Sequence, residues 1–131
     1  MRNKVKLLMA GSNKKSKSFM ASLEAMIERQ YAPDMYDFLT TIGESETMKQ
    51  LAAFQPEIVL LFNGDGKATL GLLKAIKQQL PLTPVLIPLS IGDDEQAVTD
   101  ALMACGAYKC YPQPMLIDTV VHDMFVALNL E

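Results

Sequence analysis

The chain contains the sequence IVLLF at residues 58–62, a run of five consecutive apolar side chains. A strand with one solvated face alternates apolar and polar residues, whereas a parallel strand covered on both faces is apolar along its length. Two further short runs, from Val5 to Ala10 and from Val85 to Leu89, have a similar character. These runs predict three buried strands, and a less regular segment from Met35 to Thr40 is the candidate for another.

Stretches with apolar residues at helical spacing separate these runs and follow them. The first is expected to begin near Ser16, the second spans about Glu44 to Phe54, and the third ends at Pro81. Asp93 and Asp94 are acidic residues expected at the amino terminus of the fourth helix, where negative charge is stabilising. The side chains expected to face the core are, in chain order, Phe19, Leu23, Met26, Ile27, Met48, Leu51, Ala52, Leu72, Leu73, Ile76, Leu80, Val98, Leu102, Cys105, Val121, Met124, Phe125 and Leu128. Strands that alternate with helices in this way predict an α/β fold.

Composition limits the classes of protein to which the chain can belong. Its 131 residues are enough for one domain with a sizeable core. No run approaches the roughly 18 apolar residues of a membrane span, and the start of the chain lacks a signal-peptide pattern, so a cytoplasmic location without membrane contact is expected. The net charge of −3 predicts no nucleic-acid binding by this domain. Cys105 and Cys110 match no zinc or disulfide framework and are expected to be buried free thiols.

The segment GAYKCYPQP, residues 106–114, resembles the end of a response-regulator receiver domain. In that family a glycine-alanine pair precedes a short last strand, which is followed by a lysine and a proline. Here Gln113 stands at the lysine position and Pro114 follows it. The resemblance covers nearly all 131 residues. It implies a single domain, residues 1–131, with a flavodoxin-like (βα)5 doubly wound parallel sheet of strand order 2-1-3-4-5.

The resemblance also locates the positions at which receivers are phosphorylated. Two acidic residues after the first strand hold Mg²⁺ in the family, and Gly11 and Ser12 occupy those positions here. The phosphoacceptor aspartate at the end of the third strand is replaced by Phe62, and the phosphate-binding lysine by Gln113. We therefore expect a pseudo-receiver with no catalytic residue, no metal, no cofactor and no enzymatic activity.

Two positions of the family pattern are ambiguous. The hydroxyl residue after the fourth strand falls on Leu89 by strand register, or on Ser90 if Pro88 introduces a bulge. A proline is unusual in an internal strand because it cannot donate a ladder hydrogen bond, so either a bulge or a shorter strand is expected. The aromatic switch position of the last strand falls on Cys110, with Tyr111 beside it.

The leading functional hypothesis is a non-phosphorylatable, receiver-like protein-interaction domain in bacterial two-component-type signal transduction. Active receivers use the face formed by the fourth helix, the fifth strand and the fifth helix to bind partners or to dimerise. The corresponding residues are Met103, Lys109, Cys110, Tyr111 and His122. The expected partner is a protein of a signalling pathway or a second copy of the chain.

The alternative hypothesis is a sensor of a small ligand, nucleotide or anion in the vacated phosphorylation pocket. Polar neutral groups at Ser12, Asn63 and Gln113 would then replace the charged groups of the parent family. Lys14 and Lys15, near a helix start, could add an anion site together with Ser12.

Simpler interpretations compete with each of these sites. The lysines fit a solvated face better, because no GxxxxGK phosphate motif is present. Asp65 could serve as a surrogate phosphoacceptor, although its Asn-Gly-Asp-Gly context, residues 63–66, is typical of a turn. His122, the single histidine, is expected to be a partly exposed helix residue.

Overall fold

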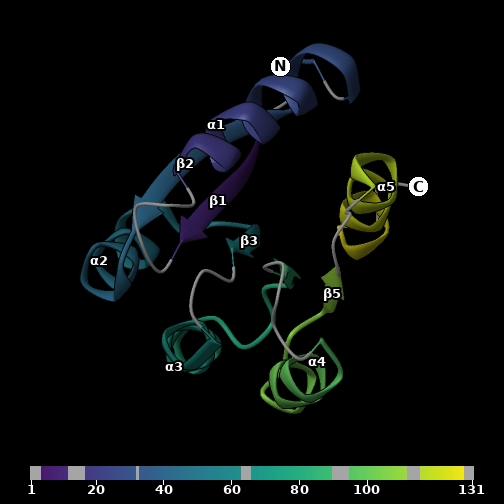
Figure 1. The fold of residues 1–131 in the computed structure, drawn as a ribbon. Helices are drawn as coiled ribbons and strands as arrows, with labels where there is room; N and C mark the ends of the chain where they lie inside the picture. Colours follow the sequence, from purple (N-terminus) through teal and green to yellow (C-terminus); the bar gives the residue numbers. More distant parts are fainter. Residues whose placement is uncertain are drawn as a thin grey trace.

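The computed structural model describes residues 4–11, 17–31, 33–62, 66–89, 95–111 and 116–128, and Figure 1 shows their arrangement. Five parallel strands form one sheet in the order β2-β1-β3-β4-β5. In chain order the elements are β1 (Val5–Gly11), α1 (Lys17–Met26), the π-helix η2 (Ile27–Tyr31), β2 (Tyr36–Ile42), α2 (Glu44–Phe54), β3 (Ile58–Phe62), α3 (Gly66–Gln79), β4 (Val85–Pro88), α4 (Glu95–Ala104), β5 (Lys109–Tyr111) and α5 (Ile117–Ala127). This topology confirms the predicted flavodoxin-like fold.

The sheet lies between two layers of helices, with α1 and α5 on one side and α2, α3 and α4 on the other (Figure 1). Successive side chains of a strand point to opposite faces, so each strand contributes to both cores. Leu7 and Leu60 pack in the core under α1 and α5, whereas Leu8 and Leu61 pack in the core under α2, α3 and α4. Burial on both faces explains why the predicted strand runs are nearly free of polar residues.

Two residues predicted to face the core are exposed. Phe19 keeps 41% of its surface exposed, and the buried positions of α1 are Met20 and Leu23 instead. Ala52 is exposed in α2, where Thr47 is fully buried. The Thr47 hydroxyl forms a 2.8 Å hydrogen bond with the Thr41 hydroxyl, which explains how a polar side chain can replace an apolar one there.

The strand bounds differ from the predicted ones at two places. β2 begins at Tyr36 and continues to Ile42, because it pairs with β1 along its whole length. β4 ends at Pro88, one residue earlier than predicted, and its register with β5 is continuous. Of the two expectations for Pro88, the shorter strand is therefore correct, and no bulge occurs in the paired residues of β4.

Pro88 is tolerated because its missing N–H falls where no ladder bond is made. Leu89 donates to the Tyr111 carbonyl on β5, whereas Pro84 accepts from the Val59 amide on β3. Because successive residues of a strand direct their backbone groups to alternate neighbours, the Pro88 nitrogen faces β3. The register between β3 and β4 ends two residues before Pro88, so the proline interrupts no pairing.

None of the helices among the described residues is long and apolar enough to cross a membrane.

Candidate functional site

The candidate site lies at the carboxyl end of the sheet, where β1 and β3 run side by side. Gly11, the last residue of β1, is in register with Phe62, the last residue of β3. In doubly wound sheets, ligands bind outside the carboxyl ends of the strands, near the point where the strand order reverses. The structure therefore brings together two of the predicted pocket positions, and neither side chain carries a polar group.

An aromatic pair covers the end of β3. The ring of Phe62 is 4% exposed and meets the ring of Phe19, in the first turn of α1, with 5.4 Å between ring centroids and an interplanar angle of 73°. This edge-to-face geometry is a favoured one for aromatic rings. The pair fills with hydrocarbon the place where a phosphoacceptor carboxylate is expected in the parent family.

Several predicted site residues lie outside the described part of the chain. They are Ser12, Lys14, Lys15, Asn63, Asp65, Ser90, Asp93, Asp94 and Gln113. The hypotheses of a ligand pocket, an anion site and a surrogate acceptor depend on these residues and stay predictions. Leu89, the other candidate for the hydroxyl position, is 2% exposed directly after β4. Among the described residues, no three His, Cys, Asp or Glu side chains gather in a way that could hold a metal ion.

A cluster of polar side chains joins β5 to α5. Tyr111 donates a 2.7 Å hydrogen bond from its hydroxyl to Oδ2 of Asp123, and Nζ of Lys109 lies 2.9 Å from the same oxygen. The Lys109 ammonium also lies 5.7 Å from the centre of the Tyr111 ring. Asp123 was not among the predicted site residues, because its partners are 12 and 14 residues earlier in the chain and no local spacing links them.

The interaction-face prediction needs one correction. Tyr111 is 4% exposed and packs in the core under α1 and α5, so it cannot touch a partner directly in this conformation. Its hydroxyl donates a hydrogen bond to Asp123 of α5. Met103 is 44% exposed, Lys109 and His122 are also exposed, and Cys110 is half-buried. The exposed Tyr108, at 42%, adds an aromatic side chain that the sequence did not single out.

The ionisation of this cluster follows from its contacts. Burial raises the pKa of Tyr111, and the hydrogen bond to Asp123 adds to the rise. Partial burial of Asp123 acts to raise its pKa, but the hydrogen bonds from Lys109 and Tyr111 outweigh it and the pKa lies below the usual 3.8. Burial raises the pKa of Cys110 to about 11, so this free thiol stays protonated near neutral pH. Both cysteines are half-buried rather than fully buried.

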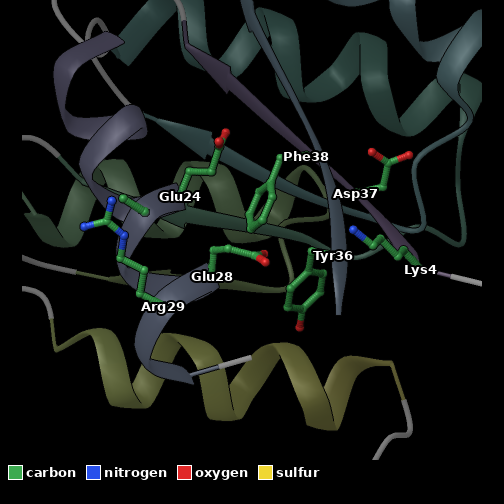
Figure 2. A pocket seen from close by; sticks show the side chains of 8 residues that line it. Lys4, Glu24, Glu28, Arg29, Tyr36, Asp37 and Phe38 are labelled. Carbon is green, nitrogen blue, oxygen red and sulfur yellow. The ribbon is translucent and has the colours of Figure 1, made fainter. Parts of the chain in front are cut away.

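A separate groove opens at the amino end of β2 (Figure 2). Its volume is about 450 Å³. It is lined by Lys4, Glu24, Ala25, Glu28, Arg29, Tyr36, Asp37 and Phe38. Because Lys4 precedes β1 and Tyr36 begins β2, the groove lies at the end of the strands opposite to the candidate site. Its charges are mixed, and Lys4 is already paired with Asp34 at 3.4 Å.

The chain was compared with known protein families, curated sequences and solved structures. No protein-family model matches the chain. The chain is similar to the DNA-binding transcriptional regulator NtrC of Escherichia coli K12, with 31% identity over 102 residues. That match includes 77% of this chain but only 21% of the regulator, so the chain spans about a fifth of its relative's length.

Several solved structures of receiver domains have the same fold as this chain. The signal receiver domain of a putative LuxO repressor protein from Vibrio parahaemolyticus superposes with a TM-score of 0.78 and 16% identity, covering 98% of this chain and 92% of that one. The receiver domain of NtrX from Brucella abortus superposes with a TM-score of 0.75 and 17% identity, covering 95% of this chain and 99% of that one. The Francisella response regulator 1452 receiver domain superposes with a TM-score of 0.70 and 17% identity, covering 97% of this chain and 98% of that one.

The molecule is thus an α/β domain of the doubly wound, flavodoxin-like class. Within that class it has the receiver fold, and the predicted resemblance to response-regulator receiver domains is confirmed.

Proposed function

We propose that the chain is a receiver-type signalling domain that accepts no phosphoryl group and that acts by binding a protein partner. The observation that carries the proposal is Phe62 at the end of β3, buried and packed edge-on against Phe19. Similarity to receiver domains and to a transcriptional regulator supports a role in two-component-type signal transduction.

Phosphoryl transfer to a receiver needs a nucleophilic carboxylate and a divalent cation held by oxygen ligands. A phenyl ring supplies neither a nucleophile nor a ligand, and the adjacent Gly11 has no side chain. The Phe19 ring packs against Phe62, so the last side chain of β3 presents hydrocarbon where a phosphoryl group would need a carboxylate. The proposed domain is therefore not an enzyme and does not catalyse its own phosphorylation.

The proposed binding surface is the face formed by α4, β5 and α5. Met103 on α4, Lys109 on β5 and His122 on α5 are exposed there, and Tyr108 lies exposed directly before β5. Aromatic residues and methionine, as at Tyr108 and Met103, are enriched in protein interfaces. A signalling protein or a second copy of the chain is the proposed partner.

The first test is a titration with beryllofluoride and Mg²⁺, a mimic of a phosphoryl group on a carboxylate, followed by amide NMR shifts. We expect no saturable shifts near Gly11 and Phe62, whereas a phosphorylatable receiver domain treated in parallel shifts at its acceptor. Saturable shifts around Phe62 would mean that another carboxylate accepts the group and would refute the proposal.

The second test concerns the binding surface. Met103→Ala and His122→Ala should weaken partner binding or self-association, measured by sedimentation velocity and by titration with a candidate partner. Lys74→Ala is the matched control, because Lys74 is an exposed residue of α3, outside this face. Equal association of all three variants would contradict the proposed surface.

A further inference from the structure

β5 and α5 lie at one edge of the sheet. β5 has three residues and pairs with β4 alone, because it is the edge strand of the sheet. The residue before α5, Leu116, makes no side-chain capping hydrogen bond. Short edge strands and uncapped helix ends are the elements that open first in local unfolding. Side-chain contacts must therefore contribute strongly to holding this part of the molecule together.

One carboxylate oxygen supplies those contacts. Oδ2 of Asp123 accepts the Tyr111 hydroxyl at 2.7 Å and lies 2.9 Å from Nζ of Lys109. Lys109 and Tyr111 are two residues apart on β5, so their side chains share the face that packs against α5. The Lys109 ammonium also lies 5.7 Å from the Tyr111 ring centre, so the three side chains form a closed triangle.

The exposure of the three side chains differs. The side chain of Asp123 is 15% exposed and that of Lys109 is 49% exposed, while Tyr111 is 4% exposed as a residue. The ring of Tyr111 packs in the same core as Val120, Val121 and Met124 of α5. Turning this ring outward would break a hydrogen bond to a charged group and would expose apolar surface at the same time.

We propose that Asp123 is a positioning residue that holds Tyr111 inside the core and so keeps the α4, β5 and α5 face in one arrangement without any ligand or covalent change. The clamp of Lys109, Tyr111 and Asp123 is a feature of this chain whether or not the face binds a partner. Its regulatory meaning, a face that is constantly ready for binding, rests on the proposed function.

The test compares two tyrosines of the same core. Tyr111→Phe removes the hydroxyl that Asp123 accepts. Tyr36→Phe makes the same chemical change at a residue that is 2% exposed in the same core and whose hydroxyl has no hydrogen-bond partner among the described residues. Lys109→Met tests the other contact of the carboxylate in a variant that keeps the buried residues unchanged. Native-state amide hydrogen exchange by NMR is measured for all three variants without any partner.

Tyr111→Phe should speed exchange in β5 and α5 by about tenfold, which corresponds to the loss of a hydrogen bond to a charged group. Amides of β1 and β2 that exchange through local openings should exchange as in the wild type, and Tyr36→Phe should not accelerate exchange in β5 or α5. Lys109→Met should produce a smaller acceleration in the same two elements, because the pair is partly exposed and screened by solvent.

Equal exchange patterns for Tyr111→Phe and Tyr36→Phe would overturn the proposal. An acceleration confined to amides that exchange through global unfolding, with none in the local openings of β5 and α5, would also overturn it, because the hydroxyl would then contribute only to global stability. Because no partner is present, the outcome is independent of whether the face binds one. Failure of the clamp is thereby distinguished from failure of the proposed function.

Discussion

At the scale of single residues, the environment of a side chain decides what it can do more than its type does. Phe62 and Phe19 place two rings in edge-to-face contact at the last residue of β3, the position where the resemblance predicts the family's carboxylate. Tyr36 and Tyr111 are both nearly fully buried, yet within the described part of the chain the Tyr111 hydroxyl has a hydrogen-bond partner and the Tyr36 hydroxyl has none. Burial raises the pKa of Tyr36 to about 12, so neither hydroxyl ionises in the physiological range.

The two tyrosines should respond in opposite directions to removal of the hydroxyl. Tyr36→Phe should raise the free energy of unfolding by about 1 kcal/mol, because it removes a buried polar atom that has no partner. Tyr111→Phe should lower it by about 1.5–3 kcal/mol, because it removes a hydrogen bond to a carboxylate. Urea denaturation followed by circular dichroism measures both. Destabilisation of equal size at the two sites would show that the Asp123 contact contributes nothing specific.

Asp123 should make the stability of the protein dependent on pH in the acid range. Its folded pKa lies below 3.8, since the hydrogen bonds from Lys109 and Tyr111 outweigh burial. A folded pKa below the unfolded value stabilises the protein above the unfolded pKa, and this stability is lost as pH falls through the folded pKa. The stability difference between wild type and Asp123→Asn should therefore be constant down to about pH 5 and shrink below pH 3.8.

Chemical denaturation of the wild type and of Asp123→Asn in a pH series gives this difference. A difference that stays the same from neutral pH to acid would contradict the assigned role of the carboxylate.

At the scale of secondary-structure elements, the connection after α4 depends on one glycine. Gly106 has φ of +102°, in the region that residues with a Cβ rarely adopt. A Cβ there would lie 3.4 Å from Cε and Cγ of Lys77, whose ammonium donates to the Thr83 carbonyl at 2.8 Å. The Lys77 side chain thus links α3, the segment before β4 and the turn that leads into β5.

Two glycine substitutions test this interpretation. Gly106→Ala should lower the free energy of unfolding by about 1–2 kcal/mol, because an L residue is strained at this φ. Gly71→Ala, within α3, should raise it by about 0.5–1 kcal/mol, because no atom lies within 4 Å of the added Cβ and alanine favours helix. Thermal denaturation of both variants gives the comparison. Equal effects of the same sign would show that the backbone conformation at Gly106 carries no cost.

At the scale of the whole molecule, a phosphorylation site needs groups from several strands at once. The ends of β1 and β3 meet in register at Gly11 and Phe62. A carboxylate introduced at one of these two positions would therefore still lack the group needed at the other. The fold does not itself require a phosphorylation site, because the two cores on either side of the sheet consist mainly of side chains within the strands and helices, with Phe62 contributing to the core under α1 and α5.

Phe62→Asp should consequently fail to restore phosphorylation. We expect no mass increase of one phosphoryl group on incubation with acetyl phosphate and Mg²⁺, because no carboxylate follows β1 to complete the cation site. Phe62→Asn is the matched control for the loss of the ring, and circular dichroism checks that both variants fold. A phosphoryl adduct specific to Phe62→Asp would show that a single carboxylate suffices, and the cause proposed for inactivity would then be incomplete.

The amino-acid sequence by itself determined the elements and their order. Continuous apolar runs gave β1 and β3 nearly to the residue, and helical spacing together with Glu44 gave α2 with its observed bounds. These features are local, since the period of apolar residues reflects which faces become buried. The strand pattern, together with the resemblance, also placed Gly11 and Phe62 at the ends of β1 and β3, where the structure puts them in register.

Tertiary structure decided everything that depends on residues far apart in the chain. The exposure of Phe19, the burial of Thr47 against Thr41 and the tolerance of Pro88 each follow from a neighbour that no local period reveals. The same holds for the contact between Tyr111 and Asp123, which forms only because α5 packs back against β5. Hydrogen bonds and ring contacts require atoms within a few ångströms, and only the folded chain brings those atoms together.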